Sequence, residues 1–217
     1  LYRRLSADDQ DSVRLLTVQN LVAMAEVLSP AETQQLLLSS ICGAFQDKSW
    51  RVRYMAADNF VQLATAVGED VVKEDLVPAY INLMRDAEAE VRTAAATQLP
   101  GLAKLLDQNT IIERLLPVAK ELADDPSQHV RGALAAQVSA LAPLLGKDAT
   151  TEHLLPLFLQ LLKDEFPEVR LNIISRLEQV NEVIGIDLLS QSLLPAIMTL
   201  AEDKQWRARQ AIIENIP

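Results

Sequence analysis

The chain has 217 residues, of which 20 are Lys or Arg and 30 are Asp or Glu, giving a formal net charge of −10 at pH 7. Hydrophobic residues make up 49% of it, too high a fraction for a disordered tail, so the composition is typical of a soluble, packed protein. The acidic balance argues against a protein that binds nucleic acid or anionic membranes, because neutralising phosphates requires a basic face.

Cys42 is the single cysteine of the chain. No internal disulfide can form, and a reducing intracellular compartment is expected. No stretch approaches the roughly 18 apolar residues of a membrane span, and the start at Leu1 is not a signal peptide. Because the chain lacks an initiator Met and begins and ends inside a repeat, we expect it to be a segment of a longer protein.

The main signal is an internal repeat of 39 residues, as from Arg14 to Arg53, and such a period decides the fold class. An arginine recurs at this spacing, preceded by Val in five cases and by Ala208 in the last. These arginines are Arg14, Arg53, Arg92, Arg131, Arg170 and Arg209. An aspartate stands six residues before each of them, at Asp8, Asp47, Asp86, Asp125, Asp164 and Asp203.

Each repeat is predicted to form two helices. After Val52, the apolar residues Ala56, Phe60, Leu63 and Val67 follow at steps of 4, 4, 3 and 4, which trace one stripe of a helix. This second helix begins near the Val-Arg pair and ends at a glycine, a residue typical of left-handed C-terminal caps. The glycines are Gly68, Gly146 and Gly185, with Ser29 and Asp107 at the equivalent places in two other repeats.

Prolines mark specific points of these helices. The first helix, for example 74–86 or 152–164, carries a Leu-Pro or Val-Pro marker near its start, where proline is tolerated in the first turn or as a kink. Pro100-Gly101 falls inside a second helix, where proline costs about 3 kcal/mol or forces a kink. We therefore expect that repeat to bend or change pitch, and we expect Ser49 and Ser127 to be helix N-caps.

Neither helix can bury its apolar stripe alone, so neighbouring pairs must stack. The predicted fold is all-α: an α-solenoid of two antiparallel helices per unit, stacked as a curved superhelix. The predicted division is a partial repeat 1–29, repeats 30–68, 69–107, 108–146 and 147–185, and a partial repeat 186–217. Neither end resembles a capping repeat, so exposed apolar surface is expected at both.

The repeated Asp and Arg residues are predicted to be structural. The Asp can cap the second helix, and the Arg can reach the Asp of the adjacent repeat, forming a ladder of ion pairs. Exposed pairs are each worth only about 0–1 kcal/mol. A residue needed in every repeat belongs to the architecture of the repeat.

Function is instead expected where the repeats differ, in the four-residue turns between each Asp and its Val-Arg pair. The two tryptophans of the chain, Trp50 and Trp206, occupy the same turn position, each followed by an arginine. Trp and Arg are enriched at binding hot spots, and loops present them to partners. The alternative is that each Trp packs over the stem of its own Lys or Arg.

No enzymatic site is predicted. His129 and His153 lie on different elements, and Cys42 is expected to be a buried small hydrophobe. The sequence has no Gly-rich phosphate loop, no metal-ligand cluster and no nucleophile elbow. We therefore expect no catalytic residue, no metal and no cofactor.

Three runs of residues carry a resemblance to a family. They are Asp9 through Leu16, Asp47 through Met55, and the stretch from Glu152 through Gly185 to Pro195. With the 39-residue unit, they resemble HEAT repeats, specifically those of the scaffold (A) subunits of protein phosphatase 2A. The sequence departs from that pattern at 98–101, at 31–40 and at 132–137.

The resemblance implies a non-catalytic scaffold in a heterotrimer, in the cytoplasm and also the nucleus, without nucleic-acid or membrane partners. It implies two binding sites on the turns. The phosphatase regulatory subunit would contact Asp9, Gln10, Asp11, Ser12, Lys48, Ser49, Trp50, Arg51, Glu88 and Glu90. The catalytic subunit would contact Lys204, Gln205, Trp206 and Arg207.

Two other classes stay open. A HEAT-repeat transport receptor or similar adaptor would recognise basic peptides on an acidic inner face, and the Trp-Arg turns would be incidental. A cryptic enzyme or cofactor binder would show a ligand-dependent thermal shift with nucleotides or metals. Neither explains the three family-like runs.

Overall fold

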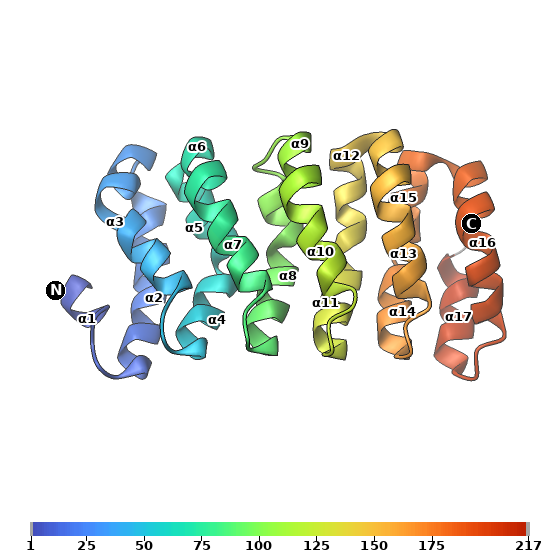
Figure 1. The fold of residues 1–217 in the computed structure, drawn as a ribbon, viewed down its shortest axis with the longest axis horizontal. Coiled ribbons are helices and arrows are strands. Elements are labelled where there is room, and N and C mark those ends of the chain that lie inside the picture. Colours follow the sequence, from blue (N-terminus) through green and yellow to red (C-terminus); the bar gives the residue numbers. More distant parts are fainter. Residues whose placement is uncertain (1, 216–217) are drawn as a thin grey trace. The chain divides into compact units, whose positions relative to one another are not determined.

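The computed structural model describes residues 2–215, and every regular element within them is helical. The chain divides into two compact units, Leu1–Thr110 and Ile111–Pro217. Within each unit, helices pack as antiparallel pairs, and neighbouring pairs stack side by side (Figure 1). The chain is therefore an all-α solenoid, as the sequence predicts. The finer division into 39-residue repeats stays a prediction.

Unit 1 begins with a short helix and continues as helical pairs. Its elements are α1 (Tyr2–Leu5), α2 (Asp11–Val27), α3 (Pro30–Phe45), α4 (Trp50–Asp58), α5 (Phe60–Val67), α6 (Glu69–Val71), η1 (Val72–Leu76), α7 (Val77–Met84), α8 (Ala89–Ala103) and α9 (Gln108–Thr110).

Unit 2 has the same alternation of elements. They are η2 (Ile111–Leu115), α10 (Leu116–Leu122), α11 (Gln128–Gln137), η3 (Val138–Leu141), α12 (Ala142–Ala149), η4 (Thr150–Leu154), α13 (Leu155–Leu162), α14 (Pro167–Ile174), α15 (Leu177–Ile184), α16 (Ile186–Ala201) and α17 (Trp206–Asn215).

The predicted apolar stripe forms the core of unit 1. Ala56, Phe60, Leu63 and Val67 are all fully buried. The Phe60 ring stacks on Phe45 at a centroid distance of 4.7 Å and lies 5.0 Å from the Tyr80 ring. Such aromatic pairs contribute about 0.5–1.5 kcal/mol beyond the area they bury, so the three rings hold α3, α5 and α7 together. The buried Tyr80 hydroxyl donates to the Ala95 carbonyl at 2.6 Å.

The three predicted glycines do end helices or kink them, but not in the left-handed helical conformation. Gly68 has φ 86° and ψ 158°, and Gly146 and Gly185 are similar. This extended region at positive φ is essentially restricted to glycine. It lets the chain leave one helix and enter the next without a loop, so Gly68 and Gly185 are both the C-cap of one helix and the N-cap of the following one.

Two repeats without this glycine use a side-chain cap instead. Ser29 has φ −66° and ψ 157° and forms a capping box with Glu32 at the start of α3. The Asp107 carboxylate accepts the Thr110 N–H at 2.9 Å. Each side chain satisfies a backbone donor that a helix start leaves unpaired.

The first helices begin earlier than the sequence predicts. The element expected over 74–86 starts at Glu69, and its Val-Pro marker follows a π-helical turn, η1, that ends at Leu76. In this turn the Val77 N–H donates to the Val72 carbonyl, five residues back. Similar π-helical turns, η2 and η4, precede Pro117 and Pro156. No such turn precedes Pro195, which lies inside the α-helix α16.

Pro100 does not end its helix, since α8 continues from Ala89 to Ala103, and the bend or change of pitch expected there stays a prediction. The comparable helix of the preceding repeat is interrupted instead, at Asn59 between α4 and α5. Gln98 on α8 bridges this interruption. Its amide nitrogen donates to the Asp58 carbonyl at 2.8 Å, and its amide oxygen accepts the Val61 N–H at 3.4 Å. Gln98 thus provides hydrogen-bond partners for two backbone groups beside the break.

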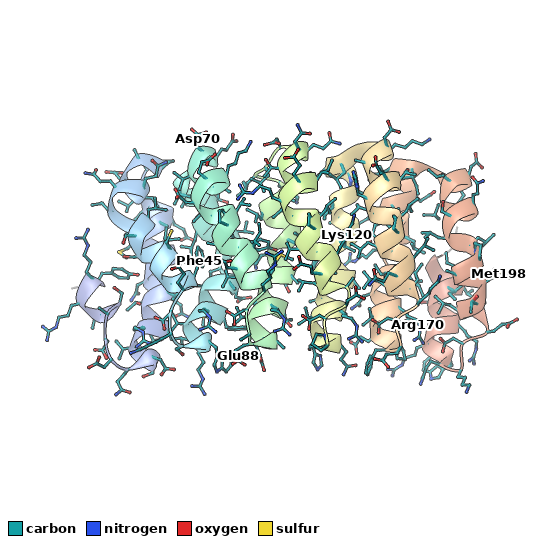
Figure 2. All side chains as sticks on the ribbon, viewed as in Figure 1. Phe45, Asp70, Glu88, Lys120, Arg170 and Met198 are labelled. Carbon is teal, nitrogen blue, oxygen red and sulfur yellow. The ribbon has the colours of Figure 1, made fainter. Side chains whose placement is uncertain are left out.

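Large apolar side chains are exposed on the helices nearest the two termini, as at Val27 on α2 and Met198 on α16. Figure 2 shows Met198 at the surface of its helix. Within residues 2–215, no helix combines the length and hydropathy that crossing a bilayer would require. The same residues contain no group of three or more His, Cys, Asp or Glu arranged to hold a metal ion.

Candidate functional site

The repeated aspartates shape the turns between first and second helices. In each of the six turns the Asp Oδ1 accepts the backbone N–H two residues later, at 2.8–3.0 Å. The donors are Gln10, Ser49, Glu88, Ser127, Phe166 and Gln205. This side chain-to-backbone bond fixes a tight turn before each second helix. We call these turns (9–12, 48–51 and 87–90 in unit 1; 126–129, 165–168 and 204–207 in unit 2) the turn ridge of their unit.

The expectation that Asp caps the second helix is therefore wrong in detail. The N-cap residue is the one two positions later, and it makes no side-chain capping bond in any of α2, α4, α8, α11 and α14. Ser49 and Ser127 stand at N-cap positions as predicted, but their hydroxyls do not cap. The aspartate instead binds the N–H of the N-cap residue, because it lies too early to reach the first helical turn.

Each repeated arginine braces the turn of its own repeat. Its Nη1 donates to the backbone carbonyl of the Asp six residues earlier, at 2.5–2.8 Å in all six cases. Arg14, for example, donates to the Asp8 carbonyl at 2.7 Å. The arginine thus ties the first turn of a second helix to the start of the loop before it.

The other end of the guanidinium reaches the next repeat. Arg14 Nε and Nη2 donate to the two oxygens of Asp47 at 2.8 and 2.9 Å. Arg53 binds Asp86 in the same two-pronged way, and in unit 2 so does Arg131 with Asp164. Arg170 binds Asp203 with Nη2 alone, at 2.6 Å. We call these contacts the ladder of each unit.

The ladder lowers the pKa of its carboxyl groups. Burial raises the pKa of Asp47, but hydrogen bonds from Arg14 and from the Ser49 N–H outweigh it, and the pKa falls below its ordinary value. The same balance lowers the pKa of Asp86 and of Asp164. These carboxylates are thus ionised, and their oxygens already accept hydrogen bonds within the protein. The ladder therefore has a structural role.

Trp50 and Arg51 form the centre of the unit 1 ridge. The Arg51 guanidinium carbon lies 5.4 Å from the centroid of the Trp50 ring, within cation–π range. Trp50 is half-buried, whereas the Arg51 side chain is 64% exposed. The aromatic ring and the charge therefore form one composite surface that faces solvent on the arginine side.

Asp11 links this pair to the neighbouring turn. Its Oδ2 accepts the Ser49 hydroxyl at 2.8 Å and lies 3.6 Å from Arg51 Nη1. The Ser49 hydrogen bond, with a smaller contribution from Arg51, lowers the pKa of Asp11 below its ordinary value. The structure thus brings together four of the predicted regulatory-subunit residues from two turns.

The remaining residues predicted for this site are exposed on the same ridge. They are Asp9, Gln10, Ser12, Lys48, Glu88 and Glu90. Figure 2 shows Glu88 at the edge of unit 1 formed by these turns, with Asp70 at the opposite edge.

Unit 2 carries a second Trp-Arg pair of the same kind. Trp206 is 58% exposed, and the Arg207 guanidinium carbon lies 5.5 Å from its ring centroid. Lys204 and Gln205 are exposed beside it. Both tryptophans thus contact their own arginine, which is the packing alternative considered from the sequence, but Trp206 keeps most of its surface available.

One ridge contact was not predicted. Arg131 of the ladder lies 5.4 Å from the Phe166 ring centroid and 3.7 Å from a Glu165 oxygen. An aromatic residue two positions after a ladder Asp is the sequence signal that could have revealed it. The two histidines remain peripheral: His129 is exposed in its turn, and His153 lies 3.9 Å from Glu152.

Comparison with known proteins matches most of the chain to HEAT repeats. Residues 69–146 match the family described as PPP2R1A-like HEAT repeat, and residues 37–67 and 154–184 match the HEAT repeat family. A stretch of 52 residues is 59% identical to the regulatory A subunit of protein phosphatase PP2A from Schizosaccharomyces pombe. That stretch covers 24% of this chain and 9% of the yeast protein.

Solved structures agree on the fold. Cex1p matches 98% of the chain with a TM-score of 0.77 at 16% identity, over 40% of its own length. A Kap121p mutant matches 99% of the chain with a TM-score of 0.76 at 17% identity, over 22% of its length. A computationally designed armadillo repeat protein for modular peptide recognition gives a TM-score of 0.64 at 20% identity over 98% of its length. These likenesses establish a stacked helical-repeat architecture.

Proposed function

The chain belongs to the HEAT-repeat family, with central repeats of the PPP2R1A-like kind, and on that premise we propose that it is a segment of a scaffold subunit of a protein phosphatase 2A-type complex. In this proposal the segment has no catalytic role. It holds a regulatory and a catalytic subunit, as part of a heterotrimer in the cytoplasm and nucleus.

The observation that carries this proposal is the composite Trp50–Arg51 surface. Its ring and guanidinium are held together by a cation–π contact, and the neighbouring turn restrains the guanidinium through Asp11. A restrained Trp-Arg pair loses little side-chain freedom on binding, which favours a hot spot. Because Arg51 is mostly exposed, its contact with Asp11 contributes little to folding.

The two binding surfaces fall in different units. The regulatory-subunit surface consists of the unit 1 ridge, with Trp50 and Arg51 at its centre. The catalytic-subunit surface begins at the turn 204–207 of unit 2, with Trp206 and Arg207.

A scaffold of this kind acts through proximity. Two partners held on one frame meet at an effective concentration set by the frame, in the millimolar range for short connections. The scaffold performs no chemical step, and its own contribution is to decide which substrates the regulatory subunit brings to the phosphatase.

Reciprocal double variants test the proposal. In titrations of the chain against a purified regulatory subunit, Trp50→Ala with Arg51→Ala should weaken binding by about 2 kcal/mol or more, roughly thirtyfold. The matched control, Trp206→Ala with Arg207→Ala, should leave that binding unchanged and reduce binding to the catalytic subunit. If the parent and the Trp50/Arg51 variant bound the regulatory subunit equally tightly, the proposal would be refuted.

A further inference from the structure

The two Trp-Arg pairs of the chain follow different turns. Trp50–Arg51 and Trp206–Arg207 occupy the same positions of the repeat, and their guanidinium carbons lie 5.4 and 5.5 Å from the ring centroids. On the turn one repeat earlier, Asp11 precedes the first pair, and Pro167 stands at the equivalent position before the second. Because each pair lies with its preceding turn in one unit, the pair of unit 2 serves as an internal comparison for the pair of unit 1.

Asp11 is fixed at both its backbone and its side chain. Its backbone begins helix α2, and its carboxylate accepts the Ser49 hydroxyl at 2.8 Å. Ser49 is fixed in turn, because its N–H donates to the carboxylate of the ladder residue Asp47 at 2.8 Å. The Asp11 carboxylate is therefore held in one place, although 37% of its side chain is exposed.

Arg51 is the group that this carboxylate restrains. Its Nη1 lies 3.6 Å from Asp11 Oδ2, while the guanidinium carbon lies over the Trp50 ring. An ion pair on one edge and a ring on one face together favour a single orientation of the planar guanidinium. The Arg51 side chain is nevertheless 64% exposed, so a docking protein can still reach it.

The arginine of the second pair lacks this restraint. Pro167 has no carboxylate, and Gln205 stands where unit 1 has the hydroxyl of Ser49. Among residues 2–215, no carboxylate forms an ion pair with Arg207, and the contact of its guanidinium is with the Trp206 ring. The two pairs thus share their ring contact and differ in the ion pair.

We propose that Asp11 is a positioning residue, which orients Arg51 over Trp50 before a partner docks. In this role Asp11 acts through Arg51, in place of the direct partner contact that the resemblance implies. Ordering a long side chain during docking weakens binding, and a side chain that is already ordered avoids this loss. The unit 1 pair therefore selects a partner that fits one arginine orientation, whereas the unit 2 pair adapts to its partner. The effect on the regulatory subunit rests on the proposed function, but the ordering of Arg51 does not.

Nuclear magnetic resonance relaxation of the arginine Nε–H groups tests the ordering in the free chain. Asp11→Ala should lower the order parameter of Arg51 to about that of Arg207. Asp11→Glu retains a carboxylate and should keep part of the ordering. The control Asp70→Ala removes an exposed carboxylate from the opposite edge of unit 1 (Figure 2) and should leave Arg51 unchanged. No decrease with Asp11→Ala, or the same decrease with Asp70→Ala, would overturn the proposal.

The missing contact can also be built into unit 2. Pro167→Asp with Gln205→Ser places a carboxylate and a hydroxyl at the positions that Asp11 and Ser49 occupy in unit 1. The exchange suits the fold, because Pro167 and Asp11 are both first residues of helices, where an aspartate is favourable. The order parameter of Arg207 should rise in this variant. An unchanged Arg207 would contradict the assignment of the ordering to this position of the repeat.

A double-mutant cycle tests how Asp11 affects binding of a purified regulatory subunit. In the parent chain, Asp11→Ala should weaken binding about two- to tenfold, the effect of ordering one long side chain. In a chain that already carries Arg51→Ala, the same substitution should change the affinity by less than about twofold, because no guanidinium is left to orient. Equal weakening in both backgrounds would mean that Asp11 contacts the partner directly, and would overturn its positioning role.

Failure of this proposal and failure of the scaffold proposal give different results. If the parent chain binds the regulatory subunit and Asp11→Ala binds it equally tightly, the scaffold function stands and the positioning role of Asp11 is overturned. If neither chain binds while Asp11→Ala still lowers the order parameter of Arg51, the scaffold function is rejected and the ordering of Arg51 is supported.

Discussion

Arg14 and Asp47, 33 residues apart in the chain, form a two-pronged ion pair with N–O distances of 2.8 and 2.9 Å. The Arg14 side chain is 5% exposed and the Asp47 side chain 12%. The same guanidinium also donates to the Asp8 carbonyl, so one side chain connects three segments of unit 1.

Removal of this guanidinium should be strongly destabilising. We expect Arg14→Ala to lower the free energy of unfolding by about 3 kcal/mol, because it leaves a buried carboxylate unpaired. Urea unfolding followed by circular dichroism measures the change. Arg51→Ala, which removes an exposed partner of Asp11, serves as the control and should cost less than about 1 kcal/mol. Similar losses for the two variants would contradict a structural role for the ladder.

Stability should fall in acid. The pKa values of Asp47, Asp86 and Asp164 are lowered in the folded state. The unfolded chain therefore binds more protons at low pH, and the stabilisation present above about pH 4 is lost as the pH drops below the unfolded value. Urea midpoints measured from pH 6 downward should show this decline. Asp47→Asn should have a shallower decline than the parent, and an identical slope would exclude Asp47 as a contributor.

Two glycines of unit 1 should respond to alanine in opposite directions. Gly68 has φ 86° and ψ 158°, so Gly68→Ala should cost about 1–3 kcal/mol in backbone strain. Gly43 lies inside α3, and an added Cβ there would meet no atom within 4 Å. Gly43→Ala should therefore stabilise by about 0.5–1 kcal/mol, the helical preference of alanine over glycine. Thermal melts of both variants would reveal the opposite signs.

Gly101 allows close packing of two helices. A Cβ at this position would lie 2.6 Å from a Val61 methyl group, so Gly101→Ala should destabilise by about 1–3 kcal/mol through overpacking. The second substitution Val61→Ala should recover part of that loss, since it removes the clashing methyl group. A double variant no more stable than expected from the sum of the single changes would rule out this contact as the cause.

The sequence predicted the features that depend on periodicity. The stripe from Ala56 to Val67 is buried as predicted, because apolar residues at helical spacing lie on one face of a helix. The contact between Arg14 and Asp47 lies where the repeat spacing places it.

The features that sequence did not predict depend on several residues at once. The π-helical turn before Pro78 moves the start of its helix to Glu69, and no single residue signals such a turn. The unbroken α8 across Pro100, and the break at Asn59 that Gln98 bridges, depend on how neighbouring helices exchange backbone hydrogen bonds. Likewise, the link from Asp11 to Ser49 and Arg51 requires two turns to be placed side by side.

The ladder also has a direction, because each of its four described ion pairs runs from an arginine to an aspartate 33 residues later. Each junction within a unit therefore uses the same connector, with the donor on one repeat and the acceptor on the next. Loss of residues 30–68 as a whole would bring Arg14 opposite Asp86 and recreate the same pair. A solenoid built from such junctions can gain or lose whole repeats over evolution without redesigning any interface between repeats.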